Sequence, residues 1–232
     1  MERQTSANFR ILSYSGEPFI NRAEAGKLLA KELGAYRGPK TIVLGIPRGG
    51  IIVAREIARE LHADLDVILA HKLRTPGQGE LAMGSISERG DLFLNEDVVR
   101  DVGVNERYIE QERDIQKAEI ARRVKLFRAV RPRALLKDRI VIITDDGVAT
   151  GATTQAAIKT AKAENPKRLV LAVPVGSEDT LRRLAIDVDE LICLKSPWSL
   201  MAVGQVYRNF DPVNDEEVIE ILRNYKVTET VK

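Results

Sequence analysis

The stretch from Ile140 to Thr154 reads IVIITDDGVATGATT, and it decides the fold class predicted for this chain. Its apolar start is typical of a strand that is buried in a parallel sheet. Two adjacent carboxylates follow, Asp145 and Asp146, and a run of small residues then leads into a helical pattern. A glycine-containing loop at the start of a helix exposes backbone N–H groups that favour an anion. The stretch therefore predicts a strand, a phosphate-binding loop and a helix, with sugar hydroxyls or a hydrated cation beside the aspartates.

The same residues resemble the phosphoribosyl pyrophosphate (PRPP) fingerprint of the type I phosphoribosyltransferases. That fingerprint has four apolar residues, two acids, two or three variable residues and then Thr-Gly-small-Thr. Here it reads VIIT at 141–144, DD at 145–146, GVA at 147–149 and TGAT at 150–153. The alternative is an ordinary strand-to-helix turn with surface acids, but the combination is more specific than a short glycine motif.

The resemblance implies a set of site residues. Asp145 and Asp146 would be the catalytic acids that hold the ribose hydroxyls, with Mg²⁺ bound nearby, mostly by PRPP oxygens. The 5′-phosphate would lie on a loop made of Ala149, Thr150, Gly151, Ala152 and Thr153.

A second strand–loop–helix unit stands earlier in the chain. Residues 41–46 (TIVLGI) read as a strand, PRGG follows at 47–50, and residues 51–61 have helical spacing. An arginine in such a loop can grip two phosphate oxygens, although PRGG alone also fits a plain turn. The resemblance implies a pyrophosphate site here, with a non-proline cis peptide at Pro47–Arg48. Its residues would be Arg48, Gly49, Gly50 and, more loosely, Lys72.

Strands and helices alternate along the rest of the chain, which is typical of an α/β fold. Core strands are expected at 41–46, 65–70, 140–143, 168–175 and 190–194, and helices at 22–33, 51–61, 105–129, 153–164, 178–186 and 215–224. We predict one domain over residues 1–232, a doubly wound, mostly parallel five-stranded core sheet of order 2-1-3-4-5 flanked by helices. In that order the first and third strands are neighbours, so both anion loops would line one crevice.

Two polar segments interrupt this pattern. The segment 72–95 is rich in glycine, and the resemblance implies a lid loop that closes over PRPP, with Arg74, Glu80 and Glu88 as residues of unassigned role. His71 is expected to be a satisfied histidine at a strand end. The segment 195–215 would be a small C-terminal hood over the base. Its Trp198 and Tyr207 are base-stacking candidates, and core packing is the competing explanation.

A long charged helix at about 105–130 runs into a basic segment, 122–139, in which Asp138 is the only acid. A solvated helix face explains such a pattern. So does an arginine lent to the partner's pyrophosphate site in a homodimer, or a patch for RNA or DNA. The sequence pattern does not separate these alternatives.

The composition sets outer limits on the function. The net charge is +2 over 232 residues, so the whole chain makes no case for nucleic-acid or membrane binding. No run of residues is apolar enough to span a bilayer, and MERQTSANFR lacks the core of a secretory signal, so we expect a cytoplasmic protein. Cys193 is the only cysteine and is expected to be buried and inert.

Two functions follow from the resemblance. The first is an enzyme of nucleotide metabolism that joins phosphoribose from PRPP to a nitrogenous base and releases pyrophosphate. The second is a PRPP-sensing regulator that binds RNA or DNA through 122–139. In the hypoxanthine–guanine members an aspartate precedes the Thr-Gly of the loop, but Ala149 stands here, which argues against a 6-oxopurine acceptor. The layout looks closest to poorly characterised phosphoribosyltransferases of prokaryotes.

Overall fold

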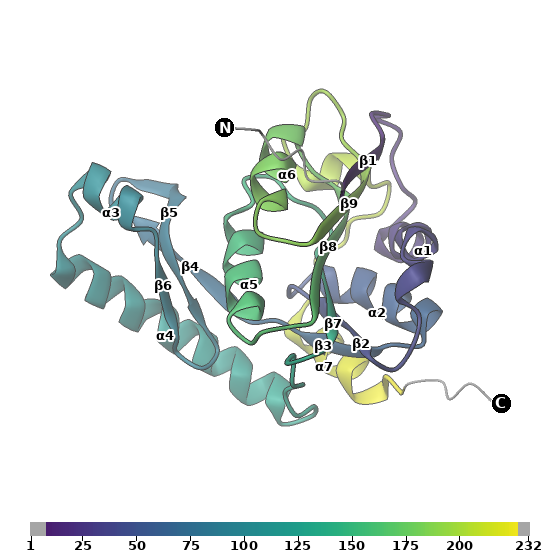
Figure 1. Cartoon of the computed structure of the whole chain (residues 1–232), viewed down its shortest axis with the longest axis horizontal. Coiled ribbons are helices and arrows are strands. Elements are labelled where there is room, and N and C mark those ends of the chain that lie inside the picture. Colours follow the sequence, from purple (N-terminus) through teal and green to yellow (C-terminus); the bar gives the residue numbers. More distant parts are fainter. Residues whose placement is uncertain (1–7, 227–232) are drawn as a thin grey trace.

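A six-stranded parallel sheet forms the centre of the molecule, in the order β1-β9-β8-β7-β2-β3 (Figure 1). The computed structural model describes residues 8–226, apart from the side chains of residues 79 and 80. The strands of the sheet are β1 (Phe9–Ser13), β2 (Thr41–Gly45), β3 (Asp64–Val67), β7 (Ile140–Thr144), β8 (Arg168–Val175) and β9 (Glu190–Lys195).

The five predicted core strands lie in the order β3-β2-β7-β8-β9, so that the ends of β2 and β7 are side by side, with Gly45 beside Thr144. The prediction of five strands is one short, because β1 pairs in parallel with β9 at the edge of the sheet. Its side chains alternate between half-buried and exposed. A strand of five residues with one half-buried face carries little apolar signal, which is why the sequence pattern misses it.

Helices cover both faces of this sheet (Figure 1). On one face lie α1 (Arg22–Glu32), α2 (Gly50–Leu61) and α7 (Asp215–Asn224). On the other face lie α5 (Ala152–Lys162) and α6 (Glu178–Ala185). Both faces are therefore buried, which explains the continuous apolar runs of the strands. Two short 3-10 helices, Gly34–Tyr36 and Val203–Val206, complete the main body.

Between β3 and β7 the chain builds a second, smaller body. The expectation of an irregular lid loop at 72–95 is wrong, because this segment forms most of an antiparallel sheet of β4 (Ala70–Thr75), β5 (Gln78–Ser87) and β6 (Leu92–Leu94). Two helices follow, α3 (Glu96–Val102) and α4 (Glu106–Arg128). We call residues 70–128 the insert.

The insert has its own small core, made of Leu73, Met83, Ile86 and Ile120. It projects from the main sheet on the side of α5, and both β4 and β5 contact that helix (Figure 1). Because α5 starts at the PRPP fingerprint, the insert stands beside the candidate phosphate loop.

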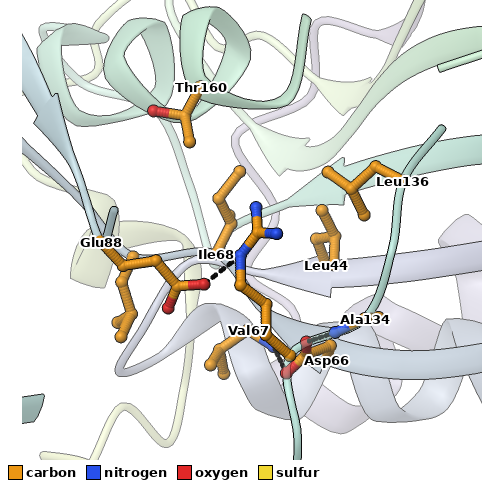
Figure 2. A pocket seen from close by; sticks show the side chains of 10 residues that line it. Leu44, Asp66, Val67, Ile68, Glu88, Ala134, Leu136 and Thr160 are labelled. Atoms are coloured by element: carbon orange, nitrogen blue, oxygen red, sulfur yellow. Dashed lines mark hydrogen bonds and ion pairs between the residues drawn. The ribbon is translucent and has the colours of Figure 1, made fainter. Parts of the chain in front are cut away.

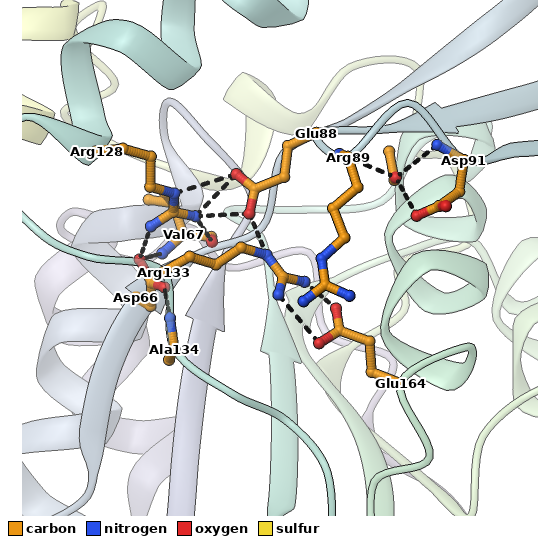
Figure 3. Close-up of polar contacts among 10 residues, drawn as sticks. Asp66, Val67, Glu88, Arg89, Asp91, Arg128, Arg133, Ala134 and Glu164 are labelled. Carbon is orange, nitrogen blue, oxygen red and sulfur yellow. Dashed lines mark hydrogen bonds and ion pairs between the residues drawn. The ribbon is translucent and has the colours of Figure 1, made fainter.

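A network of buried ion pairs joins the insert to the main sheet (Figure 3). Arg128 donates to Asp66 at 2.6 Å and to Glu88 at 3.0 Å, and Arg133 pairs with both Glu88 and Glu164. Glu88 comes directly after β5, whereas Asp66 belongs to β3. The side chain of Glu88 is only 6% exposed, so this residue has a structural role that its place in a polar segment does not reveal.

Beside this network is a small cavity of about 10 Å³ (Figure 2). Its wall includes Glu88, Leu44 and Thr160, and the Thr160 hydroxyl is buried without a hydrogen-bond partner in the described structure. Such a volume holds one water molecule at most, so this cavity is not a substrate site.

Replacement of Glu88 by glutamine is expected to lower the free energy of unfolding by about 2 kcal/mol, because two largely buried guanidinium groups lose their shared countercharge. Urea denaturation measures the change, and Glu110→Gln on the exposed side of α4 is the matched control. Equal midpoints for the two variants would contradict the structural role of the network.

None of the helices in residues 8–226 has the length and apolar character that a membrane-spanning segment requires.

Candidate active site

Two helix starts at the carboxyl edge of the sheet differ from most of the others. Four helices begin at an asparagine whose side-chain oxygen accepts a backbone N–H, namely α1, α3, α4 and α7. By contrast α2 begins at Gly49 and α5 at Gly151, without any side-chain cap, as does α6 at Ser177. In α2 the N–H groups of Gly50 and Ile51 donate to the carbonyl oxygens of Ile46 and Arg48 in the preceding loop. The first N–H groups of α5 precede its first intrahelical bond, from Gln155 to Gly151, and are therefore left for water or a ligand.

The loop before α2 lies directly against the acid pair. Its Pro47–Arg48 peptide bond is cis, which confirms the prediction. A Cβ atom placed on Gly49 would lie 1.9 Å from Oδ2 of Asp146, and one on Gly50 would lie 2.9 Å from Oδ1 of Asp145. Only glycine fits at these two positions, so the loop before α2 packs directly against the two carboxylates.

The two aspartates differ in their electrostatic surroundings. Oδ2 of Asp146 accepts a hydrogen bond of 2.7 Å from Nε of Arg22. Oδ1 of Asp145 accepts from the backbone N–H of Asp146 at 2.8 Å. Burial, and then the neighbouring charge of Asp146, raise the pKa of Asp145 well above its usual range. The pair therefore combines an ion-paired carboxylate with a carboxyl group that holds its proton more strongly.

Arg22 is a site residue that the sequence pattern does not reveal. Its side chain is 9% exposed, Nη1 donates to the carbonyl oxygen of Asp211 at 2.9 Å, and the guanidinium lies 3.7 Å from the ring centroid of Phe210. A cation in the first turn of a helix opposes the helix dipole, which is the one signal that its charge serves another purpose.

The structure corrects the assignment of Tyr207 as a base-stacking residue. Tyr207 is buried, with 6% exposure, stacks on Phe210 at 5.1 Å and donates its hydroxyl to the carbonyl oxygen of Asp146 at 2.6 Å. Burial raises its pKa. Its role is core packing behind the acid pair. Trp198 is instead 92% exposed and stacks on Tyr14 at 5.7 Å, so base stacking by Trp198 stays a prediction.

The predicted 5′-phosphate loop opens on a cavity of about 540 Å³. Thr150, Gly151 and Ala152 line it, and Gly151 has a φ of +80°, a conformation that suits glycine. Opposite them, α6 contributes Arg183 and the insert contributes Asn95. Ala149 is exposed at the edge of the loop, and its carbonyl oxygen accepts from the Thr180 hydroxyl at 3.1 Å.

A second cavity, of about 230 Å³, lies between the two anion loops. Pro47 borders it on one side and Thr153 on the other, and Lys72 lies in its wall. The structure thus brings Lys72 together with both loops, whereas Arg48, the other predicted cation of the pyrophosphate site, has an exposed side chain. The remaining residues of this wall are Ile46, Ile68, Leu69, Ala70, His71, Arg74, Gln116 and Arg123.

The basic segment 122–139 is largely neutralised within the fold. Besides Arg128 and Arg133, Arg122 pairs with Asp215 at 3.0 Å and Arg139 with Asp64 at 2.6 Å. Much of the positive charge that suggested a nucleic-acid surface therefore meets acids of the same chain. Cys193 is buried as predicted, and burial raises its pKa to about 12.

Comparisons with known proteins agree with this geometry. Residues 20–204 match the family described as phosphoribosyl transferase domain. Proteins of two Mycobacterium tuberculosis strains, CDC 1551 / Oshkosh and ATCC 25618 / H37Rv, which are provisionally named phosphoribosyl transferases, are each 45% identical over 204 residues. That alignment covers 88% of this chain and 46% of each relative. The chain thus spans about half the length of these curated relatives.

Among solved structures, the protein TT1426 from Thermus thermophilus is similar over nearly its whole length. It is 41% identical with a TM-score of 0.83, and the match covers 89% of this chain and 98% of that one. With a family match over most of its residues, two uncapped helix starts and an acid pair between them, this chain belongs to the phosphoribosyl transferase domain family.

Proposed function

We propose that this protein transfers the 5-phosphoribosyl group of PRPP to a nitrogenous base, with release of pyrophosphate and with a requirement for Mg²⁺. One observation carries the proposal, the close approach of Asp145 and Asp146 to the Gly49–Gly50 turn. It joins a carboxylate pair suited to ribose hydroxyls with a glycine turn, next to a helix start, that of α5, which is suited to phosphate.

Different residues would bind different parts of the substrate. The N–H groups at the start of α5, with Thr150 and Thr153, bind the 5′-phosphate, and the loop of residues 47–50 faces the diphosphate. Asp145 and Asp146 hold the ribose hydroxyls. As the bond from the anomeric carbon to pyrophosphate breaks, positive charge develops on the sugar ring. The negative charge of the pair stabilises it, and Arg22 holds Asp146 in place from behind.

The donor chemistry of the site fits a hard cation. The oxygens available near the ribose position are carboxylate oxygens, which Mg²⁺ prefers. In residues 8–226, apart from positions 79 and 80, no group of three or more histidine, cysteine, aspartate or glutamate side chains could form a complete metal site. Asp145 and Asp146 would therefore share the ion with substrate oxygens. When bound, Mg²⁺ neutralises charge on the departing diphosphate.

The edge of the phosphate loop limits the kind of acceptor that the site would bind. Ala149 offers no carboxylate to a purine ring nitrogen, so we propose an acceptor other than a 6-oxopurine.

The experiment that tests this function is pyrophosphate release from PRPP and Mg²⁺ against a panel of purine bases, pyrimidine bases and other nitrogenous acceptors. We expect release with at least one acceptor other than hypoxanthine or guanine, and none when Mg²⁺ is chelated. Absence of release with every acceptor, while PRPP still binds, would reject the catalytic proposal and leave a binding protein.

A further inference from the structure

The cavity of about 230 Å³ between the anion loops has a basic wall that comes mainly from the insert. Lys72 and Arg74 belong to β4, and Arg123 belongs to α4. Its other side is formed by Pro47, which follows β2, and by Thr153 in the first turn of α5. We call it the basic cavity. Three cationic side chains thus meet at a point that both candidate phosphate loops border.

Arg123 stands out among the arginines of its segment. Its nearest acid is Glu119, one turn earlier on α4, at 3.9 Å, and its Nε atom is buried without a hydrogen-bond partner in the described structure. The side chain is 21% exposed. A buried guanidinium N–H without an acceptor costs free energy. A ligand with several acceptor oxygens in the cavity would remove that cost.

A chain of buried hydrogen bonds supports the same wall. Glu112, with 7% exposure, accepts from the backbone N–H of Arg74 at 3.0 Å and from Nε2 of Gln116 at 2.9 Å. This fixes the orientation of the Gln116 amide, so its Oε1 accepts a hydrogen bond of 3.1 Å from Nδ1 of His71. Burial lowers the pKa of His71, which favours the neutral ring. Helix α4 therefore positions both Arg74 and His71.

We propose that Arg123 and Arg74, which the insert of the same chain contributes to the basic cavity, are substrate-contact residues for the diphosphate group of the phosphorylated sugar. The assignment rests on the proposed function. Guanidinium groups bind phosphate oxygens through paired, charge-assisted hydrogen bonds. Arg122, Arg128, Arg133 and Arg139 are engaged in ion pairs with acids of the same chain, whereas Arg123 faces the basic cavity.

Calorimetry with inorganic pyrophosphate and Mg²⁺ tests this assignment on the full chain. Arg123→Gln is expected to raise the Kd by about 10- to 100-fold, as removal of a charged hydrogen-bonding group does. The matched control is Arg122→Gln, which makes the same change of charge one residue earlier, on a side chain that pairs with Asp215. We expect its Kd to stay within about twofold of the parent protein.

Two results would overturn the proposal. One is an unchanged Kd for Arg123→Gln, and the other is an equal loss in both variants, which would mean general attraction by positive charge. Arg74→Gln gives an independent reading if Arg123→Gln does not fold, and it is expected to weaken pyrophosphate binding in the same range.

Mixing experiments separate an arginine of the same chain from one lent by a partner. Protein carrying Arg123→Gln is mixed with protein carrying Asp145→Asn and Asp146→Asn, and pyrophosphate release is followed. Because both groups act in one chain, no activity should return. Restored activity would show that Arg123 acts across an interface and would reject the proposal.

The two proposals fail in different ways. If no acceptor supports turnover but pyrophosphate binding still depends on Arg123, the assignment of the basic cavity is supported and the proposed reaction is rejected. If turnover is found and both the Kd for pyrophosphate and the KM for PRPP are unchanged in Arg123→Gln, the reaction stands and the assignment of Arg123 falls.

Discussion

Asparagine at both positions 145 and 146 is expected to weaken Mg²⁺-dependent PRPP binding by about 10³-fold and to abolish pyrophosphate release. The two carboxylates are the acidic groups that lie against the Gly49–Gly50 turn, and each would contribute a charged hydrogen bond to the ribose or its cation. Calorimetry with PRPP and Mg²⁺ measures the affinity. Unchanged affinity would reject both an enzyme and a PRPP-sensing regulator.

Because Asp146 is ion-paired, this variant needs a control for folding. The single variant Asp145→Asn leaves the Arg22–Asp146 pair intact and should keep the thermal midpoint close to that of the parent. Asp179→Asn, an identical change at an exposed position in the first turn of α6, should alter neither affinity nor stability. A loss of binding in Asp179→Asn would mean that any lost acid near the loop has the same effect.

Methionine in place of Arg22 is expected to lower the free energy of unfolding by about 3–5 kcal/mol, because Asp146 is left largely buried without its countercharge. Guanidinium denaturation gives the size of the loss. The same variant should also raise the KM for PRPP, since Asp146 loses the group that orients it. Arg22→Lys keeps the charge, but it cannot reproduce the second bond to Asp211 or the stack on Phe210, so partial rescue is expected.

Arg10→Met is the matched control for the loss of an ion pair. Arg10 pairs with Glu32, but the two side chains are 43% and 35% exposed, so this pair should contribute less than about 1 kcal/mol. Equal losses in Arg10→Met and Arg22→Met would show that burial does not set the strength of the Arg22 pair.

Local chemistry is the part of this protein that its sequence predicts well. The PRPP fingerprint, the PRGG loop with its cis peptide and the helix starting at Asn105 depend on neighbours in the chain. In each case the residues that make the turn or the cap are within a few positions of one another, so their pattern carries the information.

The insert shows how composition can mislead. Glycines and polar residues in 72–95 suggest a loose lid, yet two of the glycines lie in the turns of an antiparallel sheet. Pro76 and Gly77 join β4 to β5, with Gly77 at a φ of +69°, and Gly90, at +88°, lies between β5 and β6. A Pro-Gly pair between two potential strands was a visible hairpin signal.

Long-range contacts are the part that the sequence does not reveal. Arg22 is 124 residues from Asp146, and Arg128 is 62 residues from Asp66. Apart from the unfavourable place of Arg22 in the first turn of a helix, nothing near either arginine in the chain distinguishes it from a solvated charge. Tyr207 is likewise 61 residues from Asp146, whose carbonyl oxygen its hydroxyl contacts, so its place in the core depends on the fold of the whole chain.

The burial of Phe127 limits how the two bodies could ever be separated. This side chain belongs to α4, the last element of the insert, yet it is fully enclosed among the main-sheet side chains. A shortened protein in which β3 was joined directly to β7 would have a void in its core where that ring had been. Loss of a buried phenylalanine ring typically costs about 3–5 kcal/mol. The insert therefore cannot be deleted without loss of stability. Relatives that lack it would have to fill that space with another large side chain.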